Sequence, residues 1–206
     1  PVRPGICVRC TSIGDYSSAL YEEEVEAINQ AIAKRRDEFA TGRWLARRTM
    51  AQLELPIGII GRGEQRQPLW PSGSVGSITH TDDIAAVAVG TDTSCRSIGI
   101  DLEMWPRVTS ELHSKLFTRD ELAALDGQPA AAAGLLFSAK EAGYKATFPL
   151  AERFIGFQEA EIDVDWSQRR FSIRYVGKHT DNSVMEQGEG CFLISDQYAL
   201  SLFLIP

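Results

Sequence analysis

Residues 97–103 read Ser-Ile-Gly-Ile-Asp-Leu-Glu, which predicts a β-strand that ends in two carboxylates. Because alternate side chains of a strand share a face, Asp101 and Glu103 are expected to project together. Two carboxylates held this way repel one another unless a cation lies between them. Oxygen ligands of this kind suit Mg²⁺, which keeps waters and takes substrate phosphates as further ligands. For this motif by itself, a solvated strand end is the competing interpretation.

Further strands are expected on both sides of this segment. Before it, residues 75–80 and 84–89 predict a hairpin around the polar turn Thr81-Asp82-Asp83, and residues 6–13 predict another strand. Glycines and prolines make residues 56–74 a loop with one short strand. After it, we expect strands near residues 158–166, 170–176 and 191–205.

Helical patterns accompany both groups of strands. Residues 20–52 predict helix, with Gly42 marking a break between two helices. Residues 109–125 predict another helix with a capping box inside it, and residues 130–147 predict a third, which Pro149 ends. Helix followed by antiparallel strands occurs twice, so we expect an α+β chain of two α/β halves, residues 1–104 and 105–206.

The composition excludes some classes of function. The chain of 206 residues carries 21 Lys and Arg against 28 Asp and Glu, a net charge of −7. This balance argues against a nucleic-acid-binding face over the whole molecule. No apolar run approaches the roughly 20 residues of a membrane span, and the first residues lack the apolar segment of a signal peptide. We therefore expect a cytoplasmic protein that binds neither nucleic acid nor membrane.

The cysteines predict no metal site. Cys7 and Cys10 form a C-x2-C pair. A zinc site would require a second pair or histidines at ligand spacing, and none follows. We expect part-buried thiols in a reducing compartment, where disulfides are rare.

A second motif lies in residues 137–145, which read Phe-Ser-Ala-Lys-Glu-Ala-Gly-Tyr-Lys. On a helix, Glu141 and Lys145 form an i, i+4 pair on one face, and Lys140 lies about 100° around from Glu141. An ordinary surface salt bridge would explain the pair. The rest of the helix is rich in Ala and aromatic residues, so Glu141 could instead complete the metal site as a third carboxylate.

Two further clusters suit a phosphate. Thr79 and His80 fall at the end of a predicted strand and could donate hydrogen bonds to a phosphate. A capped strand end with a half-exposed histidine explains them equally well. Arg35, Arg43 and Arg47 can share one side of the first helix, and arginine makes planar, multi-donor contacts with phosphate. A solvated basic face is the other interpretation of this run.

Four segments in order resemble the signature of the 4′-phosphopantetheinyl transferases. Residues 98–103 read I-G-I-D-x-E, and residues 137–145 read F-S-x-K-E-x-x-x-K. Residues 35–43 and 70–80 are similar to the enterobactin-synthetase-associated and actinobacterial branch of that family. The resemblance runs from about residue 35 to residue 160.

The resemblance implies a pseudo-dimer of two similar halves in one chain, acting as a monomer, with coenzyme A in the cleft between them. It implies that Asp101, Glu103 and Glu141 hold Mg²⁺, or Mn²⁺, together with the pyrophosphate of coenzyme A. The implied nucleotide contacts are Arg35, Arg43, Arg62, Thr79 and His80, with Lys140 and Lys145 on the pyrophosphate side.

The implied reaction begins at a serine hydroxyl of an apo acyl or peptidyl carrier protein. This hydroxyl attacks the β-phosphate of coenzyme A, and 3′,5′-ADP leaves. Such a hydroxyl needs a base within hydrogen-bond reach, for which Glu141 is the candidate, while Lys140 or Lys145 steadies the departing phosphate. Siderophore, nonribosomal peptide and polyketide synthesis are the pathways that the analogy favours.

Two alternatives from other classes remain. A magnesium-dependent nucleotide phosphohydrolase would use the same three carboxylates, with water as the acceptor. A non-catalytic coenzyme A-binding protein would need the phosphate contacts but not the three carboxylates.

Overall fold

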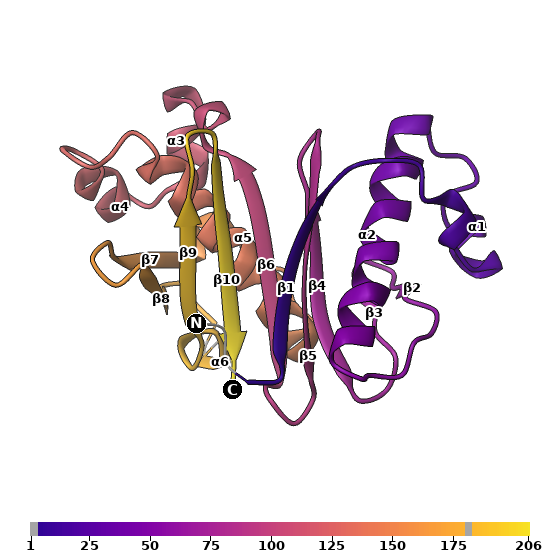
Figure 1. Ribbon diagram of the computed structural model, residues 1–206. Helices are drawn as coiled ribbons and strands as arrows, with labels where there is room; N and C mark the ends of the chain where they lie inside the picture. The colour runs from indigo at the N-terminus through magenta and orange to yellow at the C-terminus, as the bar shows by residue number, and fades with distance from the viewer. Residues whose placement is uncertain (1–3, 180–182) are drawn as a thin grey trace. The chain divides into compact units, whose positions relative to one another are not determined.

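A computed structural model describes residues 4–179 and 183–206 of the chain (Figure 1). The chain divides into two compact units, Pro1–Arg96 and Ser97–Pro206. Each unit packs one helix of 20 residues on an antiparallel sheet, so the expected α+β class is confirmed. Within the described residues, no helix has both the length and the apolar character that crossing a bilayer requires.

The main sheet of the first unit has the antiparallel strand order β1–β5–β4. β5 is central, which explains why residues 85–89 are fully buried. The predicted hairpin is confirmed as β4 and β5. The strands cover Ile6–Ser12 (β1), Ser74–His80 (β4) and Ile84–Thr91 (β5), and a separate small hairpin is formed by Gly61–Arg62 (β2) and Pro68–Leu69 (β3).

The long helix α2 (Ala33–Gln52) packs on β5. The prediction of a break at Gly42 is wrong, because α2 continues through this residue. A Cβ at Gly42 would lie 2.8 Å from Cγ2 of Ile78, so the glycine allows the helix to approach the sheet closely. The break falls earlier, at residues 27–32, between α1 (Glu22–Glu26) and α2.

A buried ion pair joins α1 to α2. Arg47 donates to both carboxylate oxygens of Glu24, at 2.8 and 3.0 Å. The backbone N–H of Ile60 donates to the same carboxylate at 2.9 Å, and Arg47 also donates to the carbonyl of Ala19 in the 3₁₀ helix η1 (Ser17–Ala19). Arg47 therefore holds the first unit together, although the sequence groups it with Arg35 and Arg43.

The second unit has a five-stranded antiparallel sheet of order β6–β10–β9–β8–β7. β6 pairs along its length with β10, so it lies in this unit, whereas the sequence-based division places it in residues 1–104. The single strand expected at 191–205 is two strands joined by a turn. The strands are Ser97–Met104 (β6), Ala160–Asp165 (β7), Arg170–Tyr175 (β8), Glu189–Ile194 (β9) and Tyr198–Ile205 (β10).

Helix α5 (Ala132–Ala151) packs against β6 and β10. A Cβ at Gly99 of β6 would lie 1.8 Å from the carbonyl oxygen of Ala142, so only glycine permits this contact. The prediction that Pro149 ends the helix is wrong. The helix ends two residues later, where Glu152 adopts a left-handed conformation (φ 49°) and donates its N–H to Phe148 O at 2.8 Å.

The helix expected at 109–125 is two helices, α3 (Ser110–Leu116) and α4 (Arg119–Ala124). The capping box predicted inside this stretch is confirmed, and it is what begins α4. Thr118 Oγ1 accepts from Glu121 N at 3.3 Å, and Glu121 Oε2 accepts from Thr118 N at 2.9 Å. Short helices at Trp105–Arg107 (η2), Phe157–Glu159 (η3) and Ser183–Glu186 (α6) complete the unit.

Candidate active site

In the second unit, β6 and α5 bring an aspartate and a lysine into contact. Lys145 Nζ donates to Asp101 Oδ1 at 2.7 Å and to Ile100 O at 3.2 Å. From the same helix, Ser138 Oγ donates to the carbonyl of Asp101 at 3.2 Å. The side chain of Asp101 is 8% exposed and that of Lys145 is 28% exposed, so the pair lies at the margin of the core.

Glu141 and Glu103 belong to the same electrostatic cluster. Burial raises the pKa of Glu141, which Lys145 opposes and Asp101 reinforces. Burial likewise raises the pKa of Glu103, and the charges of Asp101 and Glu141 add to the rise. The charges of Asp101 and Glu141 therefore act on Glu103, and the charge of Asp101 acts on Glu141.

The donor chemistry of this cluster fits a hard divalent cation. Three carboxylates supply only oxygen ligands, and a bound cation would offset the repulsion and burial that raise the pKa values of Glu103 and Glu141. Among the described residues, no group of three or more His, Cys, Asp or Glu side chains lies in an arrangement that could already hold a metal ion. The ammonium of Lys145 is the cation that contacts Asp101 here.

Lys140 lies differently from Lys145. Its Nζ donates to Glu121 Oε2 at 2.6 Å, to Phe157 O at 2.6 Å and to Leu116 O at 3.0 Å. Only 2% of its side chain is exposed. An ammonium has three protons, so these three acceptors use all of them.

A small apolar cavity of about 110 Å³ adjoins Glu141. The sequence analysis does not single out its aromatic lining, although Tyr144 lies one helical turn after Glu141 and so shares its face. The rings of Tyr144 and Phe154 meet edge to face, 5.5 Å apart. The other lining residues are Lys140, Ile155, Gly156, Phe157, Ala160 and Met185.

In the first unit, three of the arginines predicted from the sequence meet in a cavity of about 340 Å³. Arg35 and Arg43 come from α2, and Arg62 comes from β2, where its Nη1 donates to Ala27 O at 2.9 Å. Burial lowers the pKa of Arg43 to about 10, and the neighbouring arginines add to this effect. Its guanidinium lies 3.5 Å from the ring centre of Phe39. A bound anion would offset this concentration of positive charge.

Arg66 lines the same cavity and is a residue that the sequence analysis misses. It lies in the turn between β2 and β3, where it adopts a left-handed conformation (φ 67°). Its backbone N–H donates to Gly63 O at 2.9 Å, which closes the turn. The glycines around Arg62 predict a tight turn there, and such a turn brings Arg66 back beside Arg62.

His80 lies beside this cavity and not among its lining residues. His80 Nε2 is 2.6 Å from Arg35 Nη1 and 3.6 Å from Glu38 Oε2. Thr79 is buried, and the alternation of β4 turns it to the face opposite His80. The structure therefore brings His80, but not Thr79, next to Arg35.

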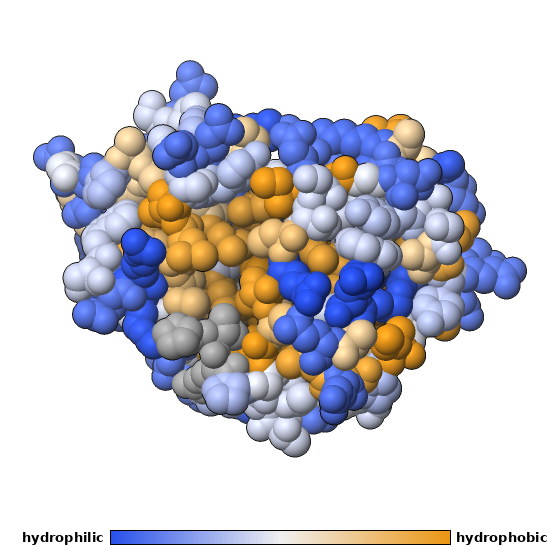
Figure 2. Space-filling view, viewed as in Figure 1, coloured by the Kyte–Doolittle hydropathy of each residue, from blue (hydrophilic) through white to orange (hydrophobic). Residues whose placement is uncertain are grey.

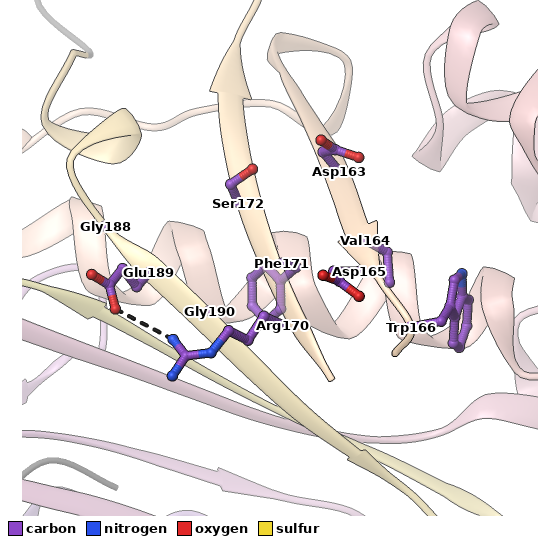
Figure 3. A pocket seen from close by; sticks show the side chains of 10 residues that line it. All are labelled: Asp163, Val164, Asp165, Trp166, Arg170, Phe171, Ser172, Gly188, Glu189 and Gly190. Atoms are coloured by element: carbon purple, nitrogen blue, oxygen red, sulfur yellow. Dashed lines mark hydrogen bonds and ion pairs between the residues drawn. The ribbon is translucent and has the colours of Figure 1, made fainter. Parts of the chain in front are cut away.

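A third hollow, of about 500 Å³, contains none of the predicted site residues (Figure 3). Asp163 and Ser172 lie side by side on β7 and β8, and Arg170 reaches Glu189 at 3.5 Å. Asp165 accepts from Ser167 and Gln168, so it belongs to the β7–β8 turn. This hollow is open, and its charged groups make an ion pair and turn contacts at the surface of the sheet.

Apolar residues gather over β9 and β10 on the same unit (Figure 2). Leu193 and Ile194, at the end of β9, are 56% and 38% exposed. Cys7, Cys10, Cys95 and Cys191 form no disulfide.

Comparison with known proteins matches both units to one family. The model described as the 4′-phosphopantetheinyl transferase N-terminal domain matches residues 23–90, and that of the 4′-phosphopantetheinyl transferase superfamily matches residues 97–202. The chain is 36% identical over 159 residues to the 4′-phosphopantetheinyl transferase PptT of Mycobacterium tuberculosis, covering 76% of this chain and 70% of that protein.

Two other relatives support the same match. The 4′-phosphopantetheinyl transferase Npt of Nocardia iowensis is 40% identical over 148 residues, covering 68% of this chain and 64% of Npt. The enterobactin synthase component D of Salmonella typhimurium is 34% identical over 143 residues, covering 66% of this chain and 58% of that protein.

Proposed function

This chain belongs to the 4′-phosphopantetheinyl transferase superfamily, and we propose that it moves the phosphopantetheine arm of coenzyme A onto a serine of an apo acyl or peptidyl carrier domain. The observation that carries the proposal is the meeting of Asp101 with Lys145, beside the mutually interacting carboxylates of Glu103 and Glu141. A purely structural helix–strand contact would not need three acids whose charges act on one another.

Glu141 is the base in this proposal. It takes the proton from the carrier serine as the serine oxygen forms its bond to the β-phosphorus of coenzyme A. The bond from that phosphorus to the bridging oxygen breaks, and 3′,5′-ADP leaves with the electron pair. Burial raises the pKa of Glu141 above the ordinary glutamate range, which makes its carboxylate a stronger base than a solvated one.

Asp101, Glu103 and Glu141 would hold Mg²⁺ or Mn²⁺. When bound, the cation would neutralise negative charge on the phosphate. Lys145 steadies the departing phosphate, because its ammonium is already directed at this cluster and is partly exposed. The ammonium of Lys140 donates to three oxygens of the chain, which favours Lys145 for this role.

The two cavities match the two ends of coenzyme A in chemistry. The arginine-lined cavity of the first unit suits the phosphates of the nucleotide, to which Arg35, Arg43 and Arg62 donate in this proposal, with His80 and Thr79 further out. The apolar cavity beside Glu141 suits the uncharged pantetheine arm.

The carriers that we propose belong to siderophore, nonribosomal peptide or polyketide synthesis. One relative is named as a component of enterobactin synthase, and others are named as phosphopantetheinyl transferases. We further propose that the protein acts as a monomer in the cytoplasm. The phosphohydrolase and the non-catalytic binding protein receive no support from these comparisons.

The test is an intact-mass measurement of an apo carrier domain incubated with the protein, coenzyme A and Mg²⁺. We expect a gain of one phosphopantetheine, lost with EDTA and lost in Asp101→Ala. Asp163→Ala is the matched control, since it removes an exposed carboxylate of the same unit. Hydrolysis of coenzyme A with no change in the carrier would replace the proposal with the phosphohydrolase.

A further inference from the structure

We propose that Lys140 is a positioning residue: its buried pair with Glu121 holds the wall of the cavity beside Glu141, and its ammonium does not contact phosphate. This inference rests on the proposed function, because it assigns a role within the same site. It departs from the family resemblance, which sets Lys140 beside Lys145 on the pyrophosphate side.

The pair joins five elements of the second unit. Lys140 Nζ, on α5, binds the last residue of α3 through Leu116 O and the first residue of η3 through Phe157 O. Its partner Glu121 accepts from Thr118 N at the start of α4 and from Ile162 N of β7, at 2.9 and 3.0 Å. The side chains of Lys140 and Glu121 are only 2% and 4% exposed.

Residues 155–157, which these hydrogen bonds hold in place, form part of the wall of the apolar cavity beside Glu141. Phe157, whose carbonyl accepts from Lys140, lines it together with Ile155 and Gly156. Gln158 adds a second tie, because its Nε2 donates to Phe117 O at 2.7 Å. Glu141 itself, the residue that follows Lys140 on α5, also lines the cavity. The Lys140–Glu121 pair therefore sets the distance between this wall and the proposed base.

A phosphate contact would require the ammonium to leave this position. Three acceptors already take its three protons, and moving it would leave the Glu121 carboxylate buried without its cation. Lys145, by contrast, is 28% exposed and contacts Asp101. One lysine of the motif thus faces the reacting groups, and the other faces the scaffold.

The first experiment is a double-mutant cycle in the full chain with Lys140→Met and Glu121→Gln, read as transfer to an apo carrier domain. Each single variant leaves a buried group with the wrong partner and lowers kcat, by about 100-fold if the wall shifts by about 1 Å. The double variant removes both charges and recovers at least tenfold of that loss. If Lys140 bound phosphate, Glu121→Gln would keep its kcat and the double variant would stay as inactive as Lys140→Met.

The second experiment separates positioning from general stability. The Kd for 3′,5′-ADP stays within about twofold in Glu121→Gln, because Glu121 contacts no phosphate in the proposed function and the arginine-lined cavity is unchanged. Phe192→Leu is the matched control: it disturbs the same core, lowers the Tm, and leaves kcat unchanged at 25 °C. A Glu121→Gln variant that behaved like Phe192→Leu would overturn the proposal.

A third readout needs no turnover. Amide hydrogen exchange over residues 153–162 should rise in Glu121→Gln without ligand, while exchange over residues 33–52 stays unchanged. A wild-type protein that modified no carrier would rule out the proposed transferase function. The exchange result would still decide whether Lys140 is a positioning residue. Equal exchange in wild type and Glu121→Gln would sink the positioning role alone.

Discussion

Lys145 Nζ lies 2.7 Å from Asp101 Oδ1, and this contact joins α5 to the carboxylate end of β6. Burial raises the pKa of Glu141, one helical turn earlier, and the same ammonium opposes that rise. A single lysine therefore balances two of the three acids that the site brings together. Its removal should affect the charge of the site more than the packing of the helix.

Lys145→Gln should lower kcat by about 100-fold, because it removes the charged donor that the proposed function assigns to the departing phosphate. The KM for coenzyme A should change by less than about threefold, since the proposed function assigns the nucleotide to the arginines of the first unit. Steady-state transfer to a carrier domain measures both. Lys115→Gln, an exposed lysine of α3, is the control. A Lys145→Gln enzyme with the kcat of wild type would show that this ammonium has no role in the chemistry.

The raised pKa of Glu103 predicts how stability depends on pH in the absence of Mg²⁺. A carboxyl whose pKa is raised by folding binds its proton more tightly in the folded state. The free energy of unfolding therefore falls as pH rises from the unfolded-state pKa, about 4.3, through the higher folded value. Glu103→Gln removes this titration. In EDTA, urea unfolding should show the variant gaining stability relative to wild type as pH rises.

Mg²⁺ should reverse the direction in which the stability of wild type, relative to Glu103→Gln, changes with pH. A divalent cation binds the ionised carboxylates, so the stabilisation that it gives to the wild type should grow with pH. Glu103→Gln, with one ligand fewer, should gain less. Equal Mg²⁺-induced shifts in Tm for the two proteins at pH 7 would remove Glu103 from the set of ligands.

Local patterns predict the strand at 97–103 and the hairpin of β4 and β5, because alternation and turn residues are recognised within a few residues. Two helix boundaries escape such patterns. Gly42 continues α2 since Ile78 of β4 packs against it, and Pro149 is tolerated because it falls in the last turn of α5. In both cases a contact or a helix end decides the outcome, and composition does not.

The acids and basic residues of the site are predicted better than their partners. Helix geometry places Lys140 about 100° from Glu141, which already separates it from the face shared with Lys145. Its partner Glu121 is recognisable from the sequence only as part of a capping box. The contact between Lys140 and Glu121 arises when α4 packs beside α5, so no spacing rule reveals it.

Arg66→Gln should raise the KM for coenzyme A by about tenfold, because it removes one of the four arginines that line the arginine-lined cavity of the first unit. The kcat should be unchanged, since the proposed function gives Arg66 no part in the transfer step. Comparison with dephospho-coenzyme A locates the contact: a smaller effect with that substrate assigns Arg66 to the 3′-phosphate. Arg169→Gln is the matched control, because Arg169 is also an exposed arginine in a left-handed turn (φ 53°). Equal KM values for the two variants would remove Arg66 from the site.

Gly99→Ala tests whether the close contact of β6 with α5 assembles the acids. The added Cβ would lie 1.8 Å from Ala142 O and 2.7 Å from Ala146 N, and backbone atoms cannot move aside as a flexible side chain can. The strand must therefore withdraw from the helix, which costs about 1–3 kcal/mol of stability.

The same withdrawal separates Asp101 from Lys145, so transfer should fall even under conditions where Gly99→Ala is fully folded. Urea unfolding and carrier modification at 25 °C measure the two effects separately. Gly58→Ala is the control, because its Cβ would lie 3.6 Å from Pro71 Cγ, an ordinary contact. If Gly99→Ala lost stability but kept its kcat, the acids would tolerate a wider spacing between β6 and α5. That result would favour binding of the metal by Asp101 and Glu103 alone, with Glu141 acting only as the base.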